Sequence, residues 1–463
     1  MNSQLNVFYE RSIVMWDEPS RWGHTAILGK TGKGKTATMQ TLVEIAFQKK
    51  EKVIIWDIFR AENSFYGFAE DDEKMLYLNW KAGRSSKAFP LQVLLPIFAK
   101  EGIKEYKYSF PASWTPCKIN YKDLTKTELK YLMGSTSEKS EQILDNLPLD
   151  AFPTLESLRV KLIQLQNKDD MLLLPDGEGG FADIGDPRIY RTLTRAVSAL
   201  VKKNIVKADL AEGFAFIDLE NVQEDYETIT AITGRACGNI ENFMCLFFNV
   251  MSGLIYSRQK QDKGTFKPLH VFIPEVSNIA GATSKDQNVV RLMRIILQEA
   301  RDSGISVVLD TQRPQNIDAS VKGQITKWYL FAMDKDDADY IDRNLVDIPR
   351  DYNIFYELPK QGVGECLKIW QGNDNQWKFR KAAHIFPPQS HKKQAYENVV
   401  NYHNAQGIRT EAVQDSFEEK YTPVFSSQVE GDEDRKLRRK KKKKAEKEEI
   451  TDIFEAVKDV IKV

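Results

Sequence analysis

Residues 24–36 read HTAILGKTGKGKT and contain the spacing G-x-x-x-x-G-K-[ST] between Gly29 and Thr36. In such a loop the backbone N–H groups surround phosphate oxygens, and the following helix adds the positive end of its dipole. Lys35 is expected to reach the β- and γ-phosphates, and the Thr36 hydroxyl to bind Mg²⁺. The sequence therefore predicts a site for ATP and Mg²⁺. The predicted nucleotide-binding residues are Gly29, Lys30, Thr31, Gly32, Lys33, Gly34, Lys35 and Thr36.

Hydrolysis of a bound nucleotide also needs a carboxylate that activates water, a group that senses the γ-phosphate, and positive charge for the transition state. Glu275 ends the apolar run LHVFIPE and is the best candidate carboxylate, with Asp218 and Glu220 as rivals at the end of GFAFIDLE. Gln312 ends ISVVLDTQ and has an amide suited to holding water or a phosphate oxygen. Arg301 is a candidate arginine finger for a neighbouring subunit, but a cation stabilising a helix C-terminus explains it equally well.

Strands alternating with helices are predicted to position these residues. A strand precedes Gly29, an amphipathic helix covers 37–50, and the strand KVIIWD ends at Asp57. Asp57 is expected to lie near the nucleotide or the next subunit, or else to serve as a cap or turn residue. Further strands are expected at 213–220, 269–275, 305–312 and 328–333, with helices at 226–256 and 288–302. This alternation predicts an α/β fold, a mostly parallel, doubly wound sheet with helices on both faces. A β-hairpin in GECLKIWQGNDNQWKFRKA closes the domain near residue 383.

The expected domains are 1–98, the first part of the ATPase core; 99–212, a helical insertion; 213–403, the second part of the core; and 404–463, a polar tail. Inside the insertion, Thr125 and Glu128 form a predicted capping box. A leucine stripe and a basic stripe share helical spacing; the basic stripe is more typical of a solvated face than of a phosphate-binding one. The first comprises Leu155, Leu158, Leu162 and Leu165, and the second Arg188, Arg191, Arg195 and Lys202.

The tail carries RKLRRKKKKK at 435–444, in which nine of ten residues are basic. This run is predicted to be solvated and disordered, and it suits non-specific contact with nucleic acid as an accessory to the core. Apolar residues line one face of a final helix within 446–463, which either docks on its own core or binds a partner protein.

Overall charge points to no particular partner, because Lys plus Arg and Asp plus Glu are both 66 among 463 residues. The N-terminal residues lack a signal-peptide pattern, and no apolar run is long enough to span a bilayer, so we expect a cytoplasmic protein. The four cysteines form no C-x-x-C pair and are expected to be reduced, buried thiols.

The succession GKTGKGKT, VIIWDIFRAEN, GFAFIDLENV, HVFIPEVSNI, QEARDSGISVVLDTQRPQNIDASV and WYLFAM resembles the HerA/FtsK superfamily of ring-forming, ATP-driven DNA translocases. The resemblance covers roughly residues 20–340 without the helical insertion. It implies a P-loop NTPase fold of the RecA/ASCE type. By this resemblance Glu275 matches the catalytic Walker B glutamate, Gln312 the sensor glutamine, and Arg301 an arginine placed toward a neighbouring active site.

Two departures from the family pattern stand out. Pro274 occupies the position of the Walker B aspartate, so Mg²⁺ binding would rest on Thr36, helped by Asp57 or Asp310 through water. We also expect no N-terminal β-barrel like that of cellular HerA proteins, which favours a resemblance to viral packaging ATPases and plasmid or mobile-element relatives.

The predicted function is that of a homo-oligomeric ATPase, with six subunits expected, that moves double-stranded DNA without sequence preference. The alternative is a nucleotide-binding assembly or switch protein with weak or no hydrolysis, which Pro274 favours.

Overall fold

The computed structural model describes residues 23–57, 89–98, 114–133, 138–167, 173–175, 181–183, 187–210, 214–234, 236–237, 240–261, 267–276, 287–344, 353–372 and 377–384. All of them belong to one compact unit, Met1–Ala412. The second unit, Val413–Val463, lies outside the described residues, and so do the predicted basic run and final helix.

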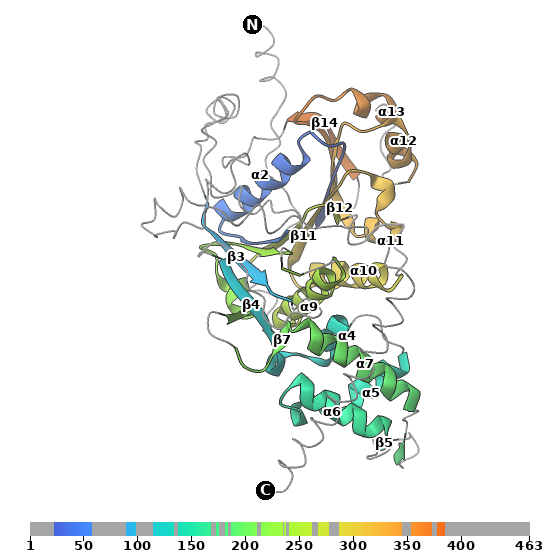
Figure 1. The fold of residues 1–463 in the computed structure, drawn as a ribbon. Helices are drawn as coiled ribbons and strands as arrows, with labels where there is room; N and C mark the ends of the chain where they lie inside the picture. The colour runs from blue at the N-terminus through green and yellow to red at the C-terminus, as the bar shows by residue number, and fades with distance from the viewer. Residues whose placement is uncertain are drawn as a thin grey trace, which may run out of the picture. The chain divides into compact units, whose positions relative to one another are not determined.

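The described residues form a twelve-stranded sheet in the order β14-β13-β12-β1-β11-β10-β2-β9-β3-β4-β7, with β8 also paired to β4 (Figure 1). Every pairing is parallel except β12 with β13 and β13 with β14. The mostly parallel α/β fold is therefore confirmed, and the predicted terminal hairpin is β13–β14. The strands are β1 His24–Leu28, β2 Lys52–Asp57, β3 Leu91–Pro96, β4 Trp114–Asn120, β7 Val206–Lys207, β8 Ala215–Phe216, β9 Ile229–Thr233, β10 Leu269–Ile273, β11 Ile305–Thr311, β12 Ile325–Phe331, β13 Glu365–Gln371 and β14 Trp377–His384.

Helices cover both faces of this sheet. The β1-α2-β2 connection crosses the sheet in one direction and the β10-α10-β11 connection in the other, and right-handed crossovers then place α2 and α10 on opposite faces. Figure 1 shows α2 on one side of β11 and β12, with α9 and α10 on the other. The core helices are α2 Lys35–Gln48, α8 Leu219–Glu224, α9 Ile240–Gln259, α10 Gln287–Asp302, α11 Ala319–Lys322, α12 Lys335–Asn344 and α13 Ile354–Glu357.

The central strands are buried because both faces are covered. All five residues of β1 and all seven of β11 are buried, as expected for strands with helices on both sides. Burial of such apolar runs contributes about 25 cal/mol per Å² of apolar surface. The sheet is thus the rigid base from which its carboxyl-end loops project.

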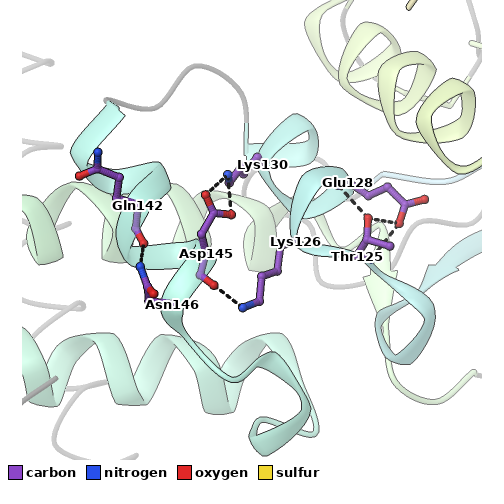
Figure 2. A network of polar contacts seen from close by, with 7 residues as sticks. All are labelled: Thr125, Lys126, Glu128, Lys130, Gln142, Asp145 and Asn146. Atoms are coloured by element: carbon purple, nitrogen blue, oxygen red, sulfur yellow. Dashed lines mark hydrogen bonds and ion pairs between the residues drawn. The ribbon is translucent and has the colours of Figure 1, made fainter. Parts of the chain in front are cut away.

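The helical segment contains α4 Lys126–Met133, α5 Glu138–Asn146, α6 Leu155–Gln166 and α7 Pro187–Lys203, together with the short hairpin of β5 Leu173–Pro175 and β6 Phe181–Asp183. The predicted capping box is present: the Thr125 N–H donates to Glu128 Oε2 at 2.8 Å, and the Glu128 N–H donates to Thr125 Oγ1 at 3.2 Å. Figure 2 shows this box beside the contacts of Lys126 and Lys130 with Asp145, which join α4 to α5.

The leucine stripe of this segment is buried, and the basic stripe is exposed to solvent. The four leucines of α6 are all buried. On α7, Tyr190, Leu193, Val197 and Leu200 are buried, whereas Arg188, Arg191, Arg195 and Lys202 are exposed. The arrangement agrees with a solvated basic face.

Two details of the strand prediction are wrong. The strand predicted at 213–220 is described from residue 214 on, and it is not a buried strand: β8 is two half-buried residues, and Asp218 instead caps α8 by accepting the Asn221 N–H at 3.0 Å. The helix predicted from 226 begins at Ile240, because Ile229–Thr233 form the buried strand β9. Its β-branched residues fit a pleated, buried surface better than a helix.

The 99–212 stretch is also not purely helical. Its residues Trp114–Asn120 form β4, which pairs with β3 in the main sheet, and β7 follows the last helix of the segment. The domain boundaries themselves stay a prediction.

No helix in the described ranges is long and apolar enough to cross a membrane. The four cysteines are free thiols; Cys117, Cys237 and Cys366 are buried and Cys245 is partly buried, which agrees with the sequence prediction.

Candidate nucleotide-binding site

The loop between β1 and α2 has the backbone geometry that its glycines permit. Gly29, Gly32 and Gly34 have φ values of 146°, 77° and 114°, which residues with a side chain rarely adopt. A Cβ on Gly29 would lie 2.6 Å from Phe331 Cβ, so β12 leaves no room for one. Gly34 is the N-cap of α2 and brings no side chain to the N–H groups of the first turn. The loop thus combines tight turns with a helix N-terminus suited to an anion.

Two neighbouring segments hold this loop in place. The Lys30 N–H donates to Ala332 O at 2.9 Å, directly after β12, and Lys30 forms an ion pair with Asp334. On the other side the Gly364 N–H donates to Lys33 O at 3.0 Å, just before β13. The loop is therefore held by the chain directly after β12 and directly before β13, the two strands that begin the antiparallel side of the sheet.

Lys35 lies inside the loop and not on its outer surface. It is 6% exposed, and its Nζ donates to Lys30 O at 3.2 Å. Burial lowers the pKa of Lys35, and the carboxylates of Asp310 and Glu275 oppose that shift. Thr36 is exposed in the first turn of α2, so its hydroxyl can meet a ligand or a metal ion.

The carboxyl ends of β10 and β11 bring the predicted catalytic pair together. Gln312 Nε2 donates to Glu275 Oε1 at 3.1 Å. Glu275 has a φ of 51°, in the left-handed region, and its N–H donates to Asp310 Oδ1. Because β11 lies between β10 and β1, this pair sits at the same sheet edge as the loop that holds Lys35.

Arg301 of this chain lies away from this group of residues. It lies in the last turn of α10, before β11 begins, and its charge acts on His24 at the start of β1. A seven-residue strand spans about 20 Å, so Arg301 and the loop lie at opposite edges of the sheet. Arg301 is 47% exposed in its side chain, and its Nε lies 3.7 Å from Asp302 Oδ1.

The rival carboxylates lie elsewhere. Asp218 and Glu220 are exposed at the start of α8, after β8, which pairs with β4 at the far end of the sheet. Asp57 ends β2 at the carboxyl edge, but its side chain lies outside the described part of the structure.

Two contacts that shape this site have no signal in the sequence. The segment 361–364 contacts the loop through Gln361 O, which accepts from Lys33 Nζ at 3.5 Å, and through Gly364. The hydrogen bond from Glu275 to Asp310 depends on the pairing of two strands far apart in sequence.

The family model described as "Helicase HerA, central domain" matches residues 22–172, less than half of the chain. The match confirms the resemblance to HerA-type ATPases. Comparison with curated proteins finds no match.

Similar solved structures include the bacterial conjugative coupling protein TrwB, with 13% identity, a TM-score of 0.48, and coverage of 81% of this chain and 88% of that one. VirB4 of Thermoanaerobacter pseudethanolicus has 14% identity and a TM-score of 0.43, covering 79% and 91%. The genome packaging NTPase B204 from Sulfolobus turreted icosahedral virus 2, in complex with AMP, has 10% identity and a TM-score of 0.33, covering 79% and 99%. At these identities and TM-scores no residue role transfers from those proteins to this chain.

Proposed function

We propose that this chain binds ATP with Mg²⁺ and hydrolyses it as a subunit of a ring that moves double-stranded DNA. The observation that carries the proposal is the meeting of Glu275 and Gln312 at the sheet edge that bears Lys35 and the glycine-rich loop. Resemblance to the HerA/FtsK superfamily assigns these residues the roles of catalytic carboxylate, sensor and phosphate-binding lysine. The HerA family match over residues 22–172 supports the same class of NTPase.

In the hydrolytic step, the oxygen of water forms a bond to the γ-phosphorus and the bond from that phosphorus to the β–γ bridging oxygen breaks. ADP and phosphate are the products. Glu275 accepts a proton from the water as it attacks, and that proton then passes to the departing phosphate or to solvent. Gln312 fixes the carboxylate through its 3.1 Å hydrogen bond. Lys35 and the loop N–H groups stabilise the negative charge on the phosphate oxygens.

A magnesium ion bound with the nucleotide would neutralise developing charge on the phosphates. The side chains present fit such an ion, because they offer oxygen ligands: the Thr36 hydroxyl is exposed in the first turn of α2, and the Asp310 carboxylate acts electrostatically on the neighbouring Lys35. Mg²⁺ prefers oxygen ligands and usually keeps several waters.

The position of Arg301 supports a ring, with six subunits as the proposed number. An arginine at the opposite end of the strands from its own loop is too far to contact the nucleotide bound there, so a role in catalysis would have to be at the site of another subunit. Double-stranded DNA, gripped through its phosphates without sequence preference, is the proposed substrate of the motor.

The competing function is a nucleotide-dependent assembly or switch protein, which Pro274 at the end of β10 favours. Turnover of ATP by the full chain, measured with and without linear double-stranded DNA, separates the two. DNA-stimulated turnover, together with displacement of a triplex-forming strand from the duplex, is the result expected of a motor. Tight ATP binding with no turnover under either condition would overturn the motor and leave the switch.

A further inference from the structure

One carboxylate is missing from the end of β10. Pro274 follows Ile273, the last residue of that strand, where the Walker B pattern places an aspartate before the catalytic glutamate. Proline supplies neither a carboxylate nor an N–H group. The nucleotide site therefore lacks its usual acidic group on this strand.

The neighbouring strand carries a carboxylate at the same level. In the β10–β11 ladder Phe272 pairs with Val308 and Ile273 with Leu309, so the next residue of β11, Asp310, lies beside Pro274. On its other side β11 pairs with β1, where Asp310 is opposite Ile27. Asp310 thus lies between the strand that ends in Glu275 and the strand that leads into the loop.

The side chain of Asp310 is directed toward the site. It is 3% exposed, and its Oδ1 accepts the backbone N–H of Glu275. Its charge acts on Lys35 more strongly than that of Glu275 does. A buried carboxylate is costly unless other groups compensate it, and here its charge interacts favourably with that of Lys35, the cation that the nucleotide loop encloses.

We propose that Asp310 replaces the missing β10 aspartate, as the carboxylate that holds the water shell of a divalent cation bound with the nucleotide phosphates. The inference rests on the proposed function. Relocation of the carboxylate by one strand explains how Pro274 is compatible with a working site. Asp310 at the same time fixes the left-handed backbone of Glu275, so one side chain orients both the cation and the catalytic carboxylate.

The test separates the charge of Asp310 from its hydrogen bond. In Asp310→Asn an amide oxygen still accepts the Glu275 N–H, but the negative charge is gone. The measurement is the affinity for ATPγS by calorimetry, in MgCl₂ and in EDTA. We expect the parent protein to bind more tightly with Mg²⁺, and the variant to lose about 10- to 100-fold of that gain while its affinity in EDTA stays the same or rises.

The double variant Pro274→Asp with Asp310→Asn returns the carboxylate to β10. It is expected to regain most of the Mg²⁺-dependent gain in affinity. Thermal melting of each variant checks that it folds. If the single variant does not fold, the double variant is the one tested. A double variant that folds but shows no Mg²⁺-dependent gain in ATPγS affinity would overturn the proposal.

An undiminished Mg²⁺-dependent gain in Asp310→Asn would also overturn it, and would leave Asp310 as a support for the Glu275 backbone alone. Failure of the parent protein to bind ATPγS in either buffer would instead remove the proposed function. The two failures are thus distinguishable.

Discussion

The side-chain amide of Gln312 donates a 3.1 Å hydrogen bond to the carboxylate of Glu275, although 37 residues separate them in the sequence. Each residue follows the end of its own strand, and β10 and β11 are neighbours in the parallel sheet. The bond restricts where the carboxylate points, and Gln312 follows the strand that lies next to β1, which leads into the nucleotide loop. If Gln312 is the sensor of the proposed function, this bond would link the state of the γ-phosphate to the orientation of Glu275.

Replacement of Gln312 by alanine should lower kcat with little change in KM, because the amide acts on the carboxylate and not on substrate binding. The expected loss is on the order of 10- to 100-fold. Steady-state ATP turnover measures it. Gln324→Ala, at a glutamine before β12, is the matched control and should keep parental turnover; an equal loss in both variants would argue against a role for the Gln312–Glu275 contact.

Gly29→Ala should disturb the loop itself. A Cβ at this position meets Phe331 Cβ at 2.6 Å, and the φ of 146° is strained for alanine. We expect a destabilisation of about 1–3 kcal/mol together with a marked loss of nucleotide affinity. Gly323→Ala is the control, since its φ is −62° and the nearest atoms to its new Cβ lie 3.7 Å away. Thermal melting and ATPγS binding check both, and unchanged binding in Gly29→Ala would contradict the loop geometry.

His24 should make the fold sensitive to acid. Its Nε2 donates to Leu297 O at 2.6 Å and its Nδ1 accepts the Val307 N–H at 3.0 Å, so the neutral ring satisfies both partners. A second ring proton would face the Val307 N–H. Burial lowers the pKa of His24 to about 4.

The unfolded chain therefore takes up this proton first as the pH falls. The contribution of neutral His24 to the free energy of unfolding is complete above about pH 6.5 and is lost as the pH falls from there to about pH 4. The total loss is on the order of 3 kcal/mol. Urea unfolding at several pH values measures it. His24→Gln keeps a donor and an acceptor but does not titrate, so its stability should fall less steeply over that range; the same slope in both proteins would refute the assignment.

Arg301 should act across subunits. Arg301→Ala and Glu275→Gln are each expected to be inactive as pure proteins. A mixture of the two should regain turnover, because some interfaces then combine an intact Glu275 site with an intact Arg301 from the neighbour. Arg294→Ala, at an exposed arginine of the same helix, should stay active alone. Mixtures that remain inactive would exclude an action of Arg301 in trans.

The nucleotide loop was predictable because its geometry is local. Glycines at three positions of positive φ, followed directly by a helix, leave few alternatives for residues 29–36. The ends of β10 and β11 are also predictable from the sequence, because the buried apolar runs stop just before Glu275 and Gln312.

What the sequence missed depends on pairing between distant strands. The sequence predicts a helix across the short strand Ile229–Thr233, because five residues beside a long apolar helix carry only a weak strand signal of their own. Asp218 looked like a strand end but caps a helix. The place of Asp310 beside Pro274 follows only from the register of two strands, and no local pattern shows it.

Hydrolysis of ATP through Glu275 is tested most directly by measuring ATP turnover of the parent protein beside Glu275→Gln, with linear double-stranded DNA present and absent. The expected result is DNA-stimulated turnover in the parent and a loss of about 10²–10⁴-fold in the variant, with ATPγS affinity retained. Glu220→Gln, at an exposed carboxylate of α8, should behave like the parent. Turnover that persists unchanged in Glu275→Gln, or no turnover in the parent despite tight nucleotide binding, would contradict hydrolysis through Glu275.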